Sequence, residues 1–459
     1  MEFGGPFFHE FAAAWSDNDG YRLARTLSPG VSTEKLMKIW RSQNAHDIKG
    51  TLGRGLKNSP AGLKRPTNQE VQGWVEVYIA YWRAAGDILA ARELSGDNKS
   101  VQSVWETVFK SWKELLIILI RGYHNHGFEA WTIPCLYVVC KHFRLFSIQA
   151  DEERSRNSAL DNNAVTTFQD DIDPETEKHE KLEDCARILN KVFTLCATDR
   201  APLEESRKWG IYYIINLLLK TYFRLNSVSL SKNVLKMLAA GQRDMPDFSA
   251  FPKSQQVTFK YHEGVLYFWE ENYVEAERHL TEAWSLCHKD AIRNKELILT
   301  YLIPCHLITT HTLPTEKLLA PYPRLQKLFL PLCRCIKRGQ LHLFDLALQE
   351  GEDEFVKRRI YLTLERGRDV ALRNLLRKVF IARGFEEAKE GEKPVRRTRV
   401  PIAEFAAAIS LGSQEKIDND EVECLLANMI YKGLMKGYIS RQHQMVVLSK
   451  SGAFPGTGV

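Results

Sequence analysis

The stretch from Ile417 to Lys450 constrains the fold most, because it specifies one helix together with both of its ends. Asp418 and Glu421 have the spacing of a capping box, in which each side chain bonds the backbone of the other residue. Gly433 stands where a helix ends in a left-handed cap. The apolar positions in between have the spacing of one buried helical face: Val422, Leu425, Leu426, Met429 and Ile430. The sequence therefore predicts a helix over this segment.

Two strand patterns follow this helix, at residues 436–440 and 443–449. Both are rich in β-branched, aromatic and long apolar residues, and only the polar pair Arg441 and Gln442 separates them. Short apolar runs joined by a polar corner are typical of a β-hairpin. The sequence therefore predicts a helix followed by a two-stranded wing.

A helix followed by such a hairpin is the second half of a winged helix, and the first half is visible upstream. Residues 369–383 have one apolar helical face, and Pro401 opens a further helix. Residues 386–399 between them are mostly charged, which predicts a solvated loop. We therefore predict a winged helix over residues 363–450, followed by a C-terminal tail at residues 451–459.

The rest of the chain has helical patterns. Helical periodicity runs through residues 75–92, 101–125, 128–148 and 181–195. Later, small and aromatic residues have roughly the offsets of a tetratricopeptide helix pair: Gly264, Tyr267, Ala276, Leu280 and Ala283. Such a pair must bury its other face against the next pair. We predict a mainly α fold, in which a right-handed helical-repeat solenoid over residues 181–362 runs into the winged helix.

Charge divides the first part of the chain. Residues 22–65 contain ten Lys or Arg against two acidic residues, which predicts a basic connector within an N-terminal helical region of residues 1–150. Residues 151–184 are the opposite, with twelve acidic residues against four basic ones. We predict an acidic flexible insertion over residues 151–180, with a domain boundary near it.

Length and cysteine usage limit the class of protein. At 459 residues the chain is long enough for several domains. Its nine cysteines form no Cys-x-x-Cys pair, which indicates reduced, buried thiols in a cytosolic or nuclear compartment. No apolar run reaches the roughly eighteen residues of a membrane helix, and the first residues lack the basic segment of a signal peptide. We expect neither membrane insertion nor secretion.

Three blocks of the sequence resemble a known family. Tyr212–Ala240, Leu299–His306 and Asp418–Lys450 are similar to the PCI proteins of the proteasome lid, the signalosome and translation initiation. Within that family they are most similar to the signalosome-subunit-twelve-like and mRNA-export PCI proteins. The resemblance implies a non-enzymatic scaffold subunit that pairs with a larger PCI protein through its winged helix. It also implies a small acidic, largely disordered partner shared with the proteasome lid, and binding of RNA or DNA across the joint surface.

The sequence contains no recognisable catalytic motif, such as a phosphate-binding loop, a Gly-x-Ser-x-Gly elbow or His-Glu-x-x-His. His124 and His126 could begin a zinc site, but residues 133–140 supply neither the Ser nor the Asp that a metalloisopeptidase would need. A polar helix end is the simpler interpretation. Cys333 and Cys335 point to different sides of a helix, which favours burial over metal binding. We expect no enzyme activity, no cofactor and no metal.

Positive charge is concentrated towards the C-terminus, where residues 357–450 hold 19 Lys or Arg against 12 acidic residues. Such residues bind nucleic-acid phosphates by displacing counterions. The candidates are Arg396, Arg397, Arg399, Lys432, Lys436, Arg441 and His443. The alternative is that these charges only keep the surface soluble. Acidic residues between Asp418 and Glu423 argue against insertion of that helix end into a groove, so we expect contacts from the wing and the loop.

Partner binding depends on the wing and on the first repeat. A bare wing edge can pair with a neighbouring chain unless a third strand near Val400 covers it. The candidates for contact with the larger PCI partner are Tyr438, Met445 and Val447. The alternative is that these three complete the winged-helix core. The candidates for a groove that takes up the small acidic subunit are Lys220, Tyr222, Arg224 and Lys232.

Two functions remain open from the sequence. The favoured one is a scaffold subunit, located in the nucleus or in both nucleus and cytoplasm, that binds nucleic acid in mRNA processing or in export coupled to transcription. The alternative is a peripheral signalosome or proteasome-lid-type subunit that makes protein contacts only.

Overall fold

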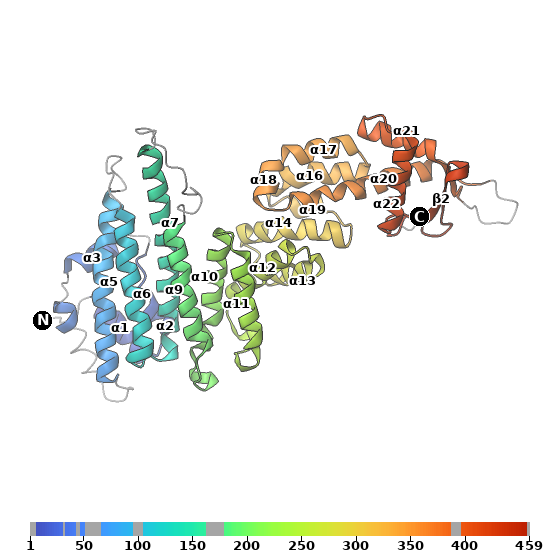
Figure 1. Ribbon diagram of the computed structural model, residues 1–459. Coiled ribbons are helices and arrows are strands. Elements are labelled where there is room, and N and C mark those ends of the chain that lie inside the picture. The colour runs from blue at the N-terminus through green and yellow to red at the C-terminus, as the bar shows by residue number, and fades with distance from the viewer. Residues whose placement is uncertain are drawn as a thin grey trace. The chain divides into compact units, whose positions relative to one another are not determined.

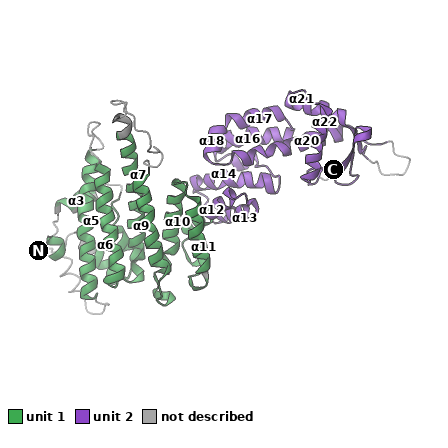
Figure 2. Cartoon of the chain, viewed as in Figure 1, with its two compact units in different colours: residues 1–262 green, residues 263–459 purple. Residues whose placement is uncertain are grey.

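The structure is a computed structural model that describes residues 6–30, 33–42, 46–50, 66–94, 104–161, 179–386 and 396–456. These residues are helical apart from turns and one three-stranded sheet, which confirms the mainly α prediction (Figure 1). They form two compact units, residues 1–262 and 263–459 (Figure 2). Within the described part of the chain, no helix is long and apolar enough to cross a membrane.

Unit 1 is a stack in which each long helix packs against the next one in the sequence. Its principal helices are α1 (Pro6–Ser16), α2 (Gly20–Thr26), α3 (Thr33–Ser42), α5 (Asn68–Leu94), α6 (Val104–Asn125), α7 (Ile133–Asp161), α9 (Glu180–Ala197), α10 (Ile211–Arg224) and α11 (Val228–Ala240). From α5 to α11 every helix contacts its successor, as a solenoid requires. The stacking therefore begins before residue 181, where the predicted repeats started.

Part of the predicted basic connector, residues 22–65, is packed into unit 1. Leu36 of α3 is fully buried, and Trp40 of the same helix stacks on Trp82 of α5 with ring centroids 4.5 Å apart. Helices α2 and α3 are short, so a few apolar side chains are enough to hold each of them. Residues 51–65 lie outside the described residues.

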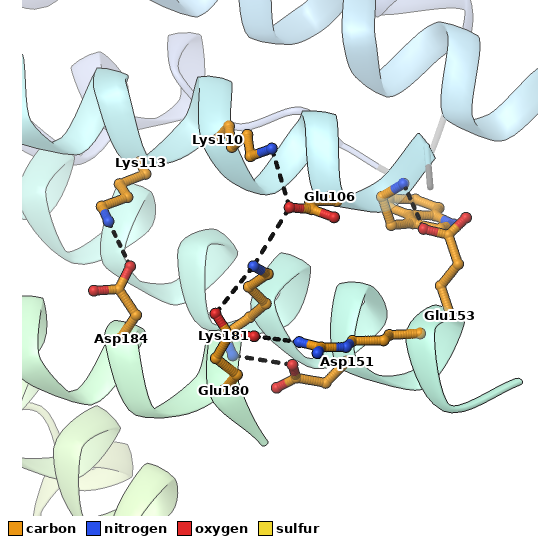
Figure 3. A network of polar contacts seen from close by, with 10 residues as sticks. Glu106, Lys110, Lys113, Asp151, Glu153, Glu180, Lys181 and Asp184 are labelled. Atoms are coloured by element: carbon orange, nitrogen blue, oxygen red, sulfur yellow. Dashed lines mark hydrogen bonds and ion pairs between the residues drawn. The ribbon is translucent and has the colours of Figure 1, made fainter. Parts of the chain in front are cut away.

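Carboxylates in the C-terminal part of α7 accept hydrogen bonds from the first backbone N–H groups of two neighbouring helices (Figure 3). The Asp151 carboxylate accepts hydrogen bonds from the backbone N–H groups of Lys181 and Leu182 at the start of α9, at 3.0 and 2.9 Å. The Glu153 carboxylate accepts one from the N–H of Trp105 at the start of α6, at 2.9 Å. Carboxylates are stabilising there, because the first N–H groups of a helix have no partner within it.

This arrangement changes the interpretation of the acidic stretch. Residues 151–161 continue α7 and are not an insertion, and residues 162–178 lie outside the described residues. Helices α7 and α9, on either side of the stretch, pack against each other. The division into units therefore comes after residue 262 and not near residues 151–180.

Unit 2 begins within α12 (Lys253–Trp269), which contains the division between the units. It continues through α13 (Tyr273–Leu286), α14 (Ile292–Thr309), α15 (Glu316–Leu319), α16 (Pro323–Arg338), α17 (Leu341–Glu350), α18 (Glu352–Lys357) and α19 (Tyr361–Glu365). A Cβ atom on Gly264 would lie 2.7 Å from Cγ of Leu280, so the predicted small residue allows α12 and α13 to cross closely. Ala276 and Ala283 are fully buried at the same crossing.

The winged helix consists of α20 (Gly367–Ala382), α21 (Ile402–Ser413) and α22 (Asn419–Tyr431) with three short strands. The strands are β1 (Arg399–Pro401), β2 (Gly437–Ser440) and β3 (Met445–Leu448), all antiparallel, in the order β1-β3-β2. A third strand at Val400 therefore covers one side of the two-stranded wing, the case that the sequence had left open. Residues 387–395 of the predicted loop lie outside the described residues.

The chain after Lys450 is not a free tail as far as Gly456. Phe454 is fully buried, and its ring centroid lies 5.8 Å from that of Phe380 in α20. The Ala453 carbonyl accepts a hydrogen bond from the N–H of Lys436 at 2.8 Å. These residues complete the winged-helix core.

Candidate partner and nucleic-acid interfaces

Local contacts fix both ends of α22, as the sequence predicts. The Asp418 side chain accepts a hydrogen bond from the N–H of Glu421 at 2.8 Å. At the other end Gly433 has a φ of +69°, and the N–H of Leu434 donates to the Met429 carbonyl at 3.0 Å. The helix buries Val422, Leu426 and Met429.

The register of the sheet determines which wing residues share a face. Arg399 pairs with Val447, and Val447 pairs with Tyr438 across the other ladder. Residues paired in this way point to the same side of an antiparallel sheet. The next row, which contains Val400 and Val446, is fully buried. Arg399, Val447 and Tyr438 therefore lie together on the outer face.

The three predicted partner residues share this outer face, because Met445 lies two positions from Val447 on β3. Tyr438 is 63% exposed, whereas Met445 and Val447 are half-buried. β3 is bonded on both sides, so β1 and β2 are the edge strands, and Tyr438 lies on β2. The predicted interface is thus a sheet face with an edge strand on either side of β3. Arg399, one of the predicted phosphate-binding residues, lies within this interface.

The predicted phosphate-binding residues fall into two groups, and the first lies at one end of the sheet. The N–H of Leu448 donates to the Thr398 carbonyl, and the N–H of Ser449 donates to the Lys436 carbonyl, both at 2.9 Å. These bonds bring the backbone of Thr398 and that of Lys436 to the same end of β3, and Arg396 and Arg397 directly precede Thr398 in the chain. The Arg396 guanidinium lies over the Phe385 ring, 4.5 Å from its centroid.

Arg396, Arg397 and Lys436 form no ion pair with any acidic residue in the described chain. We call these three residues the basic end. Strands in a sheet lie about 4.8 Å apart, and β3 lies between β1 and β2, so the basic end spans about two strand spacings.

The second group already has acidic partners. Lys432 Nζ lies 2.6 Å from an Asp369 carboxylate oxygen. Arg441, in the turn between β2 and β3, lies 3.8 Å from Asp420 and 3.9 Å from Glu423. His443 is exposed in the same turn. The acidic residues at the start of α22 therefore partly neutralise the positive charge of Arg441 in this turn.

The predicted groove for the acidic subunit lies in unit 1, and its residues differ in their environment. Lys220 is exposed on α10, but Tyr222 is buried, and burial raises the pKa of its hydroxyl. Arg224 is paired with Glu152 at 2.8 Å. Lys232, on α11, is half-buried. Lys220 is thus the member of this set best placed to meet an acidic partner.

Two cations that the sequence reasoning missed lie beside Lys220. The Arg144 guanidinium on α7 donates to the Lys220 carbonyl and to the Thr221 hydroxyl, both at 3.1 Å. Desolvation by the neighbouring side chains, followed by the charges of Arg144 and Lys141, lowers the pKa of Lys220. Cations that repel one another in this way favour an anionic partner. Lys141 and Arg144 belong to the polar positions of the predicted helix at residues 128–148, and this pattern was the sequence signal that could have identified them.

Metal binding finds no support among the described residues, where no group of three His, Cys, Asp or Glu could hold an ion. His124 is exposed and His126 half-exposed at the end of α6, as expected of a polar helix end. Cys333 and Cys335 are buried, and burial raises the pKa of Cys333 to about 12. A thiol with this pKa stays protonated and unreactive.

Stacked helices that lead into a winged helix with a three-stranded wing define a PCI-domain protein. The PCI domain family model matches residues 348–450. The chain is 67% identical to the protein CSN12 homolog of Neurospora crassa, over 98% of both chains. It is also 32% identical to PCI domain-containing protein 2 of Danio rerio, over 73% of this chain and 76% of the relative. It is 30% identical to the enhanced ethylene response protein 5 of Arabidopsis thaliana, over 98% of this chain and 94% of the relative.

The chain therefore belongs to the family of CSN12 homologs, where CSN12 is signalosome subunit 12. Proteins of this class are scaffold-type subunits and are generally not catalytic. Membership implies assembly with other PCI proteins.

Proposed function

We propose that this chain is a non-enzymatic, nuclear scaffold subunit that joins a larger PCI protein to RNA or DNA, in mRNA processing or in export coupled to transcription. The register of the wing sheet is the observation that carries the proposal. It gives one apolar face, with exposed Tyr438 and half-buried Val447, next to cations that have no acidic partner among the described residues.

The larger PCI partner binds the outer face of the wing. Tyr438 exposes a large aromatic ring on an edge strand, which can pair with a neighbouring backbone. Met445 and Val447 add half-buried apolar surface beside it. Arg399, in the same row, supplies a polar rim to this contact, as is usual around an apolar interface core.

Nucleic acid binds the basic end through its phosphates. Arg396, Arg397 and Lys436 can release counterions from a nucleic-acid backbone, because no acidic side chain of the described residues pairs with them. Such contacts position the backbone and read no bases, so binding depends little on sequence. Arg441 and Lys432 contribute less, since each has an acidic neighbour.

The small acidic subunit binds unit 1 beside Lys220. The like charges of Lys141, Arg144 and Lys220 lie on adjoining helices, and a carboxylate placed among them would relieve their repulsion. Arg224 takes part only if its pair with Glu152 opens.

The test is capture of partners from a native extract by the full-length chain, with the bound proteins identified by mass spectrometry. We expect a PCI protein to bind the unmodified chain and to be lost from the Tyr438→Asp, Val447→Asp double variant. Val356→Asp, at an exposed position of α18 outside the sheet, is the matched control. If the double variant retains the PCI partner with unchanged helical content, the wing face is not the interface.

A signalosome or proteasome-lid-type subunit that makes protein contacts only is the second candidate. It predicts the same PCI partner but no binding of RNA that weakens with salt. Titration of the purified complex with RNA at increasing salt therefore separates the two functions.

A further inference from the structure

A cavity of about 390 Å³ opens in unit 1, far along the sequence from the wing. Three segments line it: the end of α1 with the residues after it, the start of α5, and the turn between α6 and α7. Its volume is within the range of about 300–1,000 Å³ that is usual for ligand sites. None of the functions proposed above uses this cavity.

Two tryptophans form an aromatic corner of the cavity. The rings of Trp15 and Trp131 meet edge to face, with centroids 5.0 Å apart and an interplanar angle of 74°. Trp15 is held from behind by Phe11, whose ring stacks on it at 5.5 Å. Both tryptophans are half-buried, so each leaves part of its indole accessible. Indole faces attract cations more strongly than other aromatic rings do.

Three carboxylates lie in the lining, and no lysine or arginine is among those lining residues that the structure describes. They belong to Asp17, Glu70 and Glu129. Glu70 is buried in a capping box, where it accepts a hydrogen bond from the N–H of Thr67 at 2.7 Å. Asp17 lies 3.2 Å from Arg22, an exposed residue outside the lining. Among the described lining residues, carboxylates therefore outnumber lysine and arginine.

The frame that carries this corner is rigid. The Thr132 hydroxyl donates to the Glu129 carbonyl at 2.7 Å and bonds the Tyr123 hydroxyl at 2.8 Å. A Cβ atom on Gly20 would lie 1.9 Å from the Trp131 carbonyl, so only glycine lets α2 approach the turn this closely. A site held in this way loses little conformational entropy when it binds a ligand.

We propose that this cavity binds an arginine side chain from a basic segment of a partner protein. A guanidinium is planar, stacks on indole faces and bonds carboxylates through two parallel N–H groups. It therefore fits both the tryptophan corner and the carboxylates of the cavity. Carboxylates at this density repel the phosphates of RNA and DNA. A divalent metal is not the occupant, because no group of three ligating side chains exists among the described residues.

The test uses the full-length chain and a fluorescein-labelled peptide of four Arg-Gly-Gly repeats, with binding measured by fluorescence anisotropy. A peptide with citrulline in place of arginine keeps the shape and removes the charge, and a lysine peptide keeps the charge without the planar group. We expect the arginine peptide to bind at least about fivefold more tightly than either. Trp131→Leu should weaken its binding by about 2- to 30-fold, the range for one cation–π contact.

Glu129→Gln tests the carboxylate wall and should also weaken the arginine peptide. Its matched control is Glu114→Gln on α6, which removes an exposed carboxylate paired with Arg83 at 3.8 Å, outside the cavity. Thermal unfolding of each variant verifies the fold. Equal binding of the citrulline peptide, or equal losses in Glu129→Gln and Glu114→Gln, would overturn the proposal. A lysine peptide that binds as tightly as the arginine peptide would refute the choice of arginine.

Discussion

Neutralising the basic end should reduce the salt dependence of nucleic-acid binding by a predictable amount. Arg396→Gln, Arg397→Gln and Lys436→Gln together remove three cations that have no acidic partner among the described residues. Each lost phosphate contact lowers the slope of log affinity against log salt by roughly 0.7 to 0.9, so the triple variant should lose about two to three. Over a fourfold rise in salt, the unmodified chain should then lose about 20- to 40-fold more affinity than the variant.

The assay is anisotropy of a labelled single-stranded RNA with the full-length chain and its co-purified partner, between about 50 and 200 mM salt. The control is Lys432→Gln with Arg441→Gln, whose cations already have acidic neighbours at 2.6 and 3.8 Å. We expect the slope of this control to stay close to that of the unmodified chain. An unchanged slope in the triple variant would refute the argument and would place the surface on the basic stretch of residues 22–65 or on the partner.

Three further predictions concern stability, each measured by thermal or urea unfolding of the full-length chain. Asp418→Ala removes the cap of α22 and should cost about 0.5–2 kcal/mol, whereas Asp420→Ala, in the first turn of the same helix but outside the cap, should cost at most about 1 kcal/mol; equal losses would contradict the cap. Phe454→Ala should cost about 3–5 kcal/mol because the ring is fully buried, and a loss below about 1 kcal/mol would show that the tail is not part of the core. Burial lowers the pKa of His262 from 6.5 to about 3. Between about pH 3 and pH 6.5 the imidazole is therefore protonated in the unfolded chain and neutral in the folded one. Stability should therefore be complete above pH 6.5 and fall as the pH decreases, by at most about 1.4 kcal/mol per pH unit, and His262→Phe should flatten this dependence of Tm on pH.

The elements that sequence reasoning located correctly are those whose ends depend on near neighbours. Both ends of α22 are set by contacts within about five residues, from Asp418 to Glu421 and from Met429 to Leu434. The crossing at Gly264 was visible for a similar reason, since a small residue and an alanine-rich face recur at fixed offsets. Charge counts were a poorer guide. They marked residues 22–65 as a connector, although a few buried apolar side chains hold α2 and α3 of that stretch in unit 1.

The candidate interfaces needed the tertiary structure, because their residues meet across long sequence separations. The sequence by itself determined the helical class, the capped helix, the winged-helix order and the list of cations near the wing. Only strand pairing decided that Arg399 shares a face with Tyr438 and Val447, and that Lys436 joins Arg396 and Arg397 at one end. Pairing between residues 399 and 447 depends on how whole strands dock on the core. Local propensity cannot encode that register, since a shift by one residue would turn every side chain to the other face.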